Sequence, residues 1–318
     1  MVMMALLMIL CAVVLVTLVA SYICYRIAFY NPKPKDADLE QIDIPEGEIY
    51  EVFRERMTGW VKWTRSLPHE DVEILSEDGL KLRGKYYEFA PGAPMELMFH
   101  GYRGNAERDL SGGVYRCFAL GRSVLIVDQR SCGASEGDTI TFGIREHRDC
   151  LSWLDYAIKR FGPDCRIILT GISMGASTVL MAAGRELPEN VIGVLADCGF
   201  TSAREIMMDV MKNQMKLPPK PCYPFVRLGA KLFAGFDPDS TSALEAVGKI
   251  RVPVIFFHGE TDDFVPCHMS RKNYEACTAR KKLVMVPGAG HGLAFPVDEE
   301  GYLKELREFF GAEASAPV

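Results

Sequence analysis

Apolar runs alternate with amphipathic stretches along most of this chain. Residues 71–77 and 80–89 alternate polar and apolar positions around a Glu77-Asp78-Gly79 turn, which predicts an opening β-hairpin. Further strands are predicted at residues 95–100, 122–127, 166–170, 191–197, 252–258 and 282–286. Helical stretches lie between most of them, at about residues 106–120, 144–161, 174–186 and 267–279, with a last one near 298–311. The alternation predicts an α/β fold: an eight-stranded, mostly parallel sheet flanked by helices.

The amino-terminal segment is different, because residues 1–25 carry no charged side chain and residues 5–23 are almost wholly apolar. A run of this length can span a bilayer. A cleaved signal peptide normally has a basic start and a site of small residues, and neither is found here. We therefore expect residues 1–30 to be an uncleaved, single-pass transmembrane anchor, with a signal peptide or a buried helix as the alternatives.

The side of the membrane is indicated by the residues that follow this run. Arg26, Lys33 and Lys35 come after it, and no basic side chain precedes it. The positive-inside rule then places the remainder of the chain on the cytoplasmic side. Ten cysteines without CxxC pairs fit a reducing compartment and give no support to a metal site.

Residues 31–69 are predicted to join the anchor to the domain at 70–318. Residues 31–36 are polar and proline-punctuated, as in a juxtamembrane linker. Residues 47–66 predict one amphipathic helix, more plausibly packed on the domain than lying on the membrane surface. Its apolar positions recur at steps of three and four: Ile49, Val52, Phe53, Met57, Trp60 and Val61.

Composition narrows the classes of function. With 318 residues, 48% of them hydrophobic and 25% charged, the chain can bury the core of one large domain. The net charge of −6, without a basic cluster, argues against nucleic acid as a partner. Neither length nor charge indicates the oligomeric state.

The strongest chemical signal is Gly171-Ile172-Ser173-Met174-Gly175, which follows an apolar strand and opens a helix. A serine hydroxyl needs exposure, a base and nearby donors before it acts as a nucleophile. Flanking glycines permit the sharp turn that exposes the hydroxyl, and the helix beyond it presents backbone N–H groups. The pattern predicts a nucleophile elbow with Ser173 at its tip.

Four further motifs accompany the elbow in order: residues 100–105 (HGYRGN), 128–135 (DQRSCGAS), 258–266 (HGETDDFVP) and 288–291 (GAGH). Together they make residues 70–311 resemble the α/β-hydrolase superfamily, and in particular membrane-anchored bacterial α/β hydrolases of unknown substrate. The resemblance implies a serine hydrolase with no cofactor and no metal. It also implies that the long insertion at residues 198–249 is a helical lid. The prolines at positions 218, 219, 221 and 224 prevent this insertion from forming one helix.

The resemblance implies a role for each site residue. Ser173 is the nucleophile and His291 its general base, while the other five histidines are expected to be structural. Asp262 is the preferred acid that orients His291, and Asp263 and Asp197 remain alternatives. Asp128 and Arg130 are expected to brace loops beside the site.

Two backbone N–H groups, those of Tyr102 and Met174, are expected to form the oxyanion hole. Methionines of the lid share one helical face and are candidates for binding an acyl chain, although packing against the domain explains them equally well. These lid candidates are Met207, Met208 and Met211, with Met215 at the end of the same face.

The sequence thus predicts hydrolysis of a carboxylic ester or thioester through a Ser-His-Asp triad and an acyl-enzyme. The substrate is expected to be a small acyl-containing compound, including a lipid. Two alternatives remain: an amidase or peptidase-like hydrolase, and a membrane-anchored binding protein without turnover. The second is disfavoured because both nucleophile and base are present.

Overall fold

Eight strands form a single sheet in the order β1-β2-β4-β3-β5-β6-β7-β8 in the computed structural model, which describes residues 1–32 and 42–311. β1 pairs antiparallel with β2 and β2 with β4, and every other pairing is parallel, which confirms the predicted fold. The strands are β1 (Glu70–Leu75), β2 (Lys81–Tyr87), β3 (Met95–Phe99), β4 (Ser123–Val127), β5 (Ile167–Ile172), β6 (Val191–Asp197), β7 (Val254–Gly259) and β8 (Lys281–Val286).

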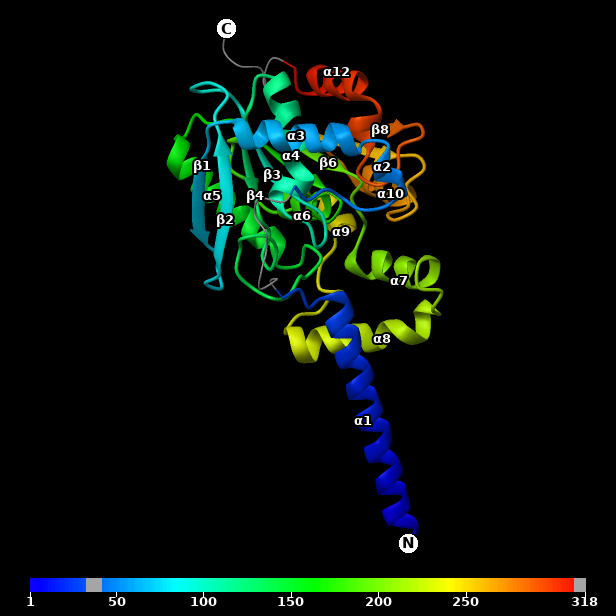
Figure 1. Cartoon of the computed structure of the whole chain (residues 1–318). Coiled ribbons are helices and arrows are strands. Elements are labelled where there is room, and N and C mark those ends of the chain that lie inside the picture. Colours follow the sequence, from blue (N-terminus) through cyan, green and yellow to red (C-terminus); the bar gives the residue numbers. More distant parts are fainter. Residues whose placement is uncertain (33–41, 312–318) are drawn as a thin grey trace.

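Helices cover both faces of the sheet because its central strands are apolar on both sides (Figure 1). Leu97 and Phe99 of β3 pack with residues of α5 and α6, whereas Met98 between them packs with residues of α4. One face carries α3 (Arg54–Ser66), α4 (Ala106–Ala119), α11 (Ala294–Val297) and α12 (Glu299–Phe310). The other carries α5 (Glu146–Phe161), α6 (Met174–Ala183), α9 (Ala243–Val247) and α10 (His268–Ala276).

The expectation of one continuous helix over residues 47–66 is wrong. The chain forms α2 (Glu48–Glu51) and α3, separated by a turn in which the Phe53 amide donates to the Tyr50 carbonyl. Val52, expected to face inward, is 84% exposed, while Tyr50 and Phe53 pack against the core under α3. The break turns Tyr50 toward the domain, where its hydroxyl finds a partner.

The amino-terminal apolar segment forms α1 (Val2–Ala28), which extends away from the body (Figure 1). Its 27 residues include an 18-residue stretch with a mean hydropathy of 3.1, as in a membrane-crossing helix, and a signal sequence meets the same criteria. Its last turns pack against α8 of the lid segment. Of the linker predicted at residues 31–36, only Asn31 and Pro32 lie within the described residues.

The predicted lid, residues 198–249, called the lid segment, places α7 and α8 on the side of the body from which α1 leaves, with α8 crossing α1, while α9 packs on the sheet (Figure 1). It contains α7 (Ala203–Asn213), α8 (Pro219–Gly229), a π-helical turn η1 (Ala230–Ala234) and α9. The insertion is not one helix, as the sequence predicted: α7 ends at Asn213, Pro218 precedes α8 and Pro219 is its first residue, although Pro224 lies inside α8. Buried side chains from the end of α1, from α7 and α8 and from the loop after β7 form one cluster around Met174.

Candidate active site

Ser173 lies between β5 and α6 in a backbone conformation that residues other than glycine rarely adopt, with φ 55° and ψ −117°. The turn is so tight that a Cβ on Gly175 would lie 2.0 Å from the Phe99 carbonyl oxygen. A Cβ on Gly171 would lie 2.1 Å from the carbonyl oxygen of Gly175. Glycine at both positions is therefore a steric requirement of the elbow.

The structure brings Ser173, His291 and Asp262 into contact, although they come from three different loops. His291 Nε2 lies 3.0 Å from Ser173 Oγ, and His291 Nδ1 lies 2.8 Å from Asp262 Oδ2. Because a carboxylate only accepts, Nδ1 carries the proton and Nε2 is left to accept one from the serine. This is the geometry of an activated nucleophile.

Asp262 is buried at the start of the loop after β7 and has four donors around its carboxylate. Oδ1 accepts from the amides of Phe264 and Val265 at 3.0 and 2.8 Å. Oδ2 faces His291 and, at 3.2 Å, His258 Nε2. Burial by itself would raise the pKa of Asp262, but the bonds from His258 and His291 outweigh it and hold that pKa well below its usual range. The group is therefore an anion at neutral pH.

The two alternative acids occupy other positions. The Asp263 side chain is exposed, and its backbone carbonyl accepts from Gln214. Asp197 is buried at the end of β6, where its Oδ2 accepts from the Tyr302 hydroxyl at 3.0 Å. Of the three candidates, Asp262 is the one hydrogen-bonded to the imidazole.

The loop after β3 lies against the elbow. The Gly101 amide donates to Asp109 Oδ2 at 3.0 Å and is thereby occupied. In the part of the chain that the structure describes, the amides of Tyr102 and Met174 donate to no protein group. Both are free to bind a negatively charged oxygen, which is the requirement for the predicted oxyanion hole.

Sequence reasoning missed three residues that support this site. The Tyr50 hydroxyl donates to the His291 carbonyl at 3.0 Å, and burial raises the pKa of Tyr50, which keeps the proton on the hydroxyl. Phe264 packs its ring 5.1 Å from the imidazole. The Asp109 carboxylate accepts from the Gly101 amide and fixes the loop after β3. Tyr50 and Asp109 lie in no recognisable motif, whereas Phe264 is part of the motif at residues 258–266, which gave no sign of its contact with His291.

The other buried histidines have structural partners, as expected. His100 accepts from the Gln129 amide at 2.9 Å, and His147 Nδ1 lies 3.0 Å from the Gly143 carbonyl. Asp128 accepts from the amides of Ala106 and Ala134, and Arg130 pairs with Asp149 and Asp78. These bonds brace the loops beside the site.

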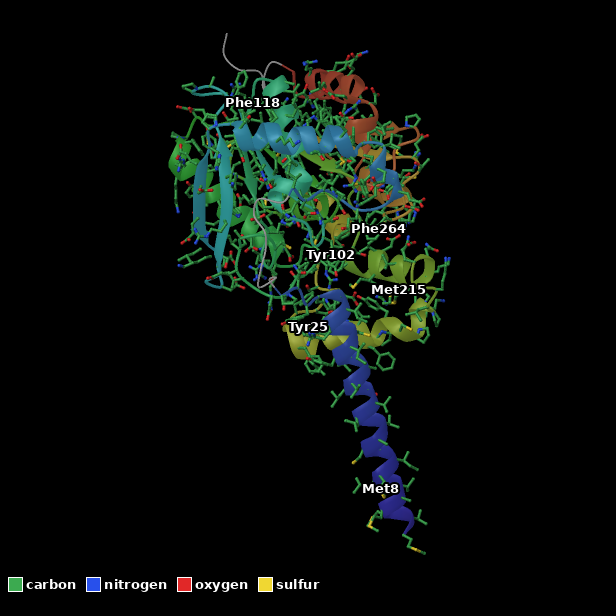
Figure 2. The ribbon with its side chains drawn as sticks, in the orientation of Figure 1. Met8, Tyr25, Tyr102, Phe118, Met215 and Phe264 are labelled. Carbon is green, nitrogen blue, oxygen red and sulfur yellow. The ribbon has the colours of Figure 1, made fainter. Side chains whose placement is uncertain are left out.

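An apolar cavity of about 460 Å³ adjoins Ser173. Met207, Met211 and Met215 line it, whereas Met208, the third lid candidate, does not. One helical residue corresponds to a rotation of about 100°, which carries Met208 off the face that Met207 presents. Met215 lies beyond the end of α7 and reaches the cavity from the following turn. Figure 2 shows Tyr102, Phe264 and Met215 on the side of the body from which α1 leaves, and Met8 far out along α1.

Among the described residues, Cys198, Asp262 and His291 are the three whose potential metal-ligand atoms lie together, within 4.8 Å of one another. Both ring nitrogens of His291 already have partners. Burial, together with Asp197 and Asp262, raises the pKa of the Cys198 thiol well above its usual value and disfavours the thiolate that binds metals. The cluster therefore supports acid–base chemistry better than metal binding.

Known proteins share both sequence and fold with this chain. The profile of the Alpha/beta hydrolase family matches residues 97–303. The uncharacterized protein YqkD of Bacillus subtilis is 30% identical over 190 residues, 60% of this chain and 62% of that protein. Protein bem46 of Schizosaccharomyces pombe is 24% identical over 77% of each chain. This chain therefore spans about three fifths of YqkD and about three quarters of bem46.

Solved structures agree on the architecture. The esterase Pf2001 of Pyrococcus furiosus matches with a TM-score of 0.66 at 23% identity, over 88% of this chain and 97% of that one. Est1E of Butyrivibrio proteoclasticus, solved with ferulic acid, matches with a TM-score of 0.55 at 20% identity, over 75% and 96%. With the sheet order, the elbow and the family profile in agreement, the chain belongs to the alpha/beta hydrolase family.

Proposed function

We propose that this protein is a serine hydrolase that cleaves carboxylic esters or thioesters through an acyl-enzyme on Ser173. The observation that carries the proposal is the continuous hydrogen-bonded line from Ser173 Oγ through the His291 imidazole to the Asp262 carboxylate, at 3.0 and 2.8 Å. Membership of a hydrolase family supports it.

In the first half-reaction Ser173 Oγ attacks the substrate carbonyl carbon while its proton passes to His291 Nε2. The carbonyl oxygen becomes an oxyanion, which the amides of Tyr102 and Met174 stabilise. When the tetrahedral intermediate collapses, the bond to the alcohol or thiol breaks and His291 returns the proton to that leaving group. In the second half-reaction a water molecule loses a proton to His291 Nε2 and attacks the acyl carbon. The bond between that carbon and Ser173 Oγ then breaks, His291 returns the proton to Oγ, and the acid is released.

We also propose that α1 remains on the protein as a single-pass membrane anchor, with the domain on the cytoplasmic side. Cleavage after residue 20 would remove Ala20 from the wall of the cavity beside Ser173 and most of the helix that carries the other α1 residues of that wall. All ten cysteines are free thiols in the structure, which is consistent with a reducing compartment.

The test is labelling of the full chain in detergent with a fluorophosphonate, followed by a chain-length series of p-nitrophenyl esters and acyl thioesters. Ser173→Ala should abolish both labelling and turnover. Ser66→Ala, which alters an exposed serine on α3, should change neither. Labelling that persists in Ser173→Ala would remove Ser173 from the role. A wild-type protein that hydrolyses no ester or thioester would instead favour a binding protein.

A further inference from the structure

The end of α1 is built into the hydrolase domain rather than tethered to it. Phe29, just past the helix, is fully buried, and its carbonyl accepts from the Ile140 amide at 2.8 Å. The last helical carbonyls, which have no partner within a helix, are bound by domain side chains. The Tyr102 hydroxyl donates to Ala28 O at 2.9 Å, and Arg103 donates to Ile27 O at 2.8 Å. Tyr102 thus joins the predicted oxyanion loop directly to α1.

A second contact fixes α1 against the lid segment. Ser21 of α1 is fully buried where the helix crosses α8, and a Cβ on Gly229 would lie 2.2 Å from the Ser21 carbonyl oxygen. Such close approach of two helices requires a small residue at the crossing. The Phe233 ring of η1 then packs against the rings of Tyr22 and Tyr25. The position and rotation of α1 are therefore set by the domain.

This rotation places one face of α1 in the wall of the cavity at Ser173. The lining residues of α1 are Ala20, Ile23, Cys24, Ile27 and Ala28. Their spacing of i, i+3, i+4, i+7 and i+8 is that of one helical face. Met207 and Met211 of α7 and Val226 of α8 line the same cavity from the lid segment. α1 and the lid segment together thus enclose the apolar space that leads to the nucleophile.

The cavity is open where α1 leaves the body. Ile23 and Ile27, although they line it, are 52% and 54% exposed, and Met215 and Leu217 on the lid side are 45% and 41% exposed. An exposed apolar rim of this kind marks an interaction surface. Since the rim includes the end of a helix long enough to cross a membrane, the proposed anchor would bring this rim against the lipid bilayer.

The charge of the lid segment agrees with a position next to a membrane surface. The chain has a net charge of −6, but residues 203–240 of the lid segment contain six basic and four acidic side chains, a net of +2. Arg204, Arg227 and Lys231 pair with Asp237 and Asp239, and the remaining basic residues are Lys212, Lys216 and Lys220. Basic side chains next to a transmembrane helix are attracted to anionic lipid headgroups.

We propose that α1 forms one wall of the acyl-binding pocket and that the substrate is a membrane lipid carrying one long acyl chain in ester linkage. This lipid would reach Ser173 sideways from the bilayer. The inference rests on the proposed serine hydrolase function. At the ~30 Å³ that a water-sized group occupies in a liquid, 460 Å³ holds on the order of 15 carbon atoms. That volume fits one long chain. The chain would lie along α1 with its carboxyl carbon at Ser173.

The test uses two cysteines of the same helix in the full-length protein, reconstituted in phosphatidylcholine vesicles. Cys24 lines the cavity, whereas Cys11 is exposed further along α1. Cys24→Trp should lower kcat/KM for p-nitrophenyl laurate and for a long-chain monoacylglycerol at least about tenfold, since it fills the space of several methylenes. p-Nitrophenyl acetate hydrolysis and fluorophosphonate labelling should be retained. Cys11→Trp should leave all four measurements unchanged.

The outcomes separate the two proposals. If wild-type Ser173 is not labelled and acetate is not hydrolysed, the serine hydrolase function fails and this inference with it. If Ser173 is labelled and acetate is hydrolysed, but Cys24→Trp keeps its long-chain activity, only the pocket assignment is overturned. Comparing the monoacylglycerol with a lysophosphatidylglycerol of the same chain then shows whether an anionic headgroup is preferred.

A second measurement covers the case in which Cys24→Trp does not fold. Wild-type protein is treated with a long-chain fluorophosphonate that carries a diazirine at the end of its alkyl chain, and is then irradiated. The phosphonate should be found on Ser173 and the photo-crosslink on a peptide containing residues 20–28. Crosslinks confined to other segments would overturn the assignment of α1 as the pocket wall.

Discussion

Replacing Asp262 with asparagine is the sharpest test of the site, because it preserves shape and inverts one hydrogen bond. The Asn carbonyl can still accept from the amides of Phe264 and Val265, which now bond Oδ1 at 3.0 and 2.8 Å. Its NH₂ group would then face His291 Nδ1, which in the wild-type protein donates to Asp262 Oδ2 at 2.8 Å. Nδ1 must become the acceptor, so the ring proton moves to Nε2, the atom that should receive the proton of Ser173.

The expected cost follows from this tautomer change and from the loss of the charge that stabilises the imidazolium. The corresponding substitution in a serine protease lowers kcat about 10⁴-fold. We expect a loss of about 10³- to 10⁴-fold here, which is about 4 to 5 kcal/mol at roughly 1.4 kcal/mol per tenfold. His258 keeps its bond to the Val265 carbonyl at 2.8 Å, so the loop after β7 should remain folded.

The assay is kcat for a short p-nitrophenyl ester together with the rate of fluorophosphonate labelling, with near-ultraviolet circular dichroism to check folding. Asp263→Asn, which changes the exposed neighbouring carboxylate, is the matched control and should behave as wild type. Wild-type labelling rates in Asp262→Asn, or a loss confined to Asp263→Asn, would refute the assignment of the acid.

Two further predictions concern support of the site and of the sheet. Tyr50→Phe removes the 3.0 Å bond to the His291 carbonyl, a loss of about 1 kcal/mol, and should lower kcat several-fold with KM unchanged; an unchanged kcat would show that this bond does not position the base. Burial opposes ionisation of Glu96, but Arg116 and Arg122 hold its pKa at about 2. The stability that this carboxylate provides is therefore complete above about pH 4.5 and lost as the pH falls toward 2. A shift of the pKa of Glu96 from 4.5 to about 2 corresponds to about 3 kcal/mol. Glu96→Gln should therefore lower the free energy of unfolding by that amount at pH 7 and flatten its dependence on acid pH, as measured by urea titration at several pH values. A variant with the wild-type pH profile would contradict the reasoning.

Much of this protein follows from local sequence. The alternation of apolar runs and amphipathic stretches predicted the eight strands, since burial on one face of a strand leaves a two-residue period and burial on both faces leaves a continuous apolar run. The glycines around Ser173 predicted the elbow, because only a residue without Cβ fits such a turn. An uncharged apolar run of bilayer length likewise predicted α1 as a helix from composition alone.

Tertiary structure decided what depends on the meeting of distant segments. The sequence favoured Asp262 as the acid and kept Asp263 and Asp197 as alternatives, and the path of the loop after β7 placed Asp262 against His291. The break before α3 turned Tyr50 toward the same histidine, which the helical period could not indicate. The face of α1 that lines the cavity was likewise set by the crossing at Gly229, since a uniformly apolar helix has no preferred side until another surface packs against it.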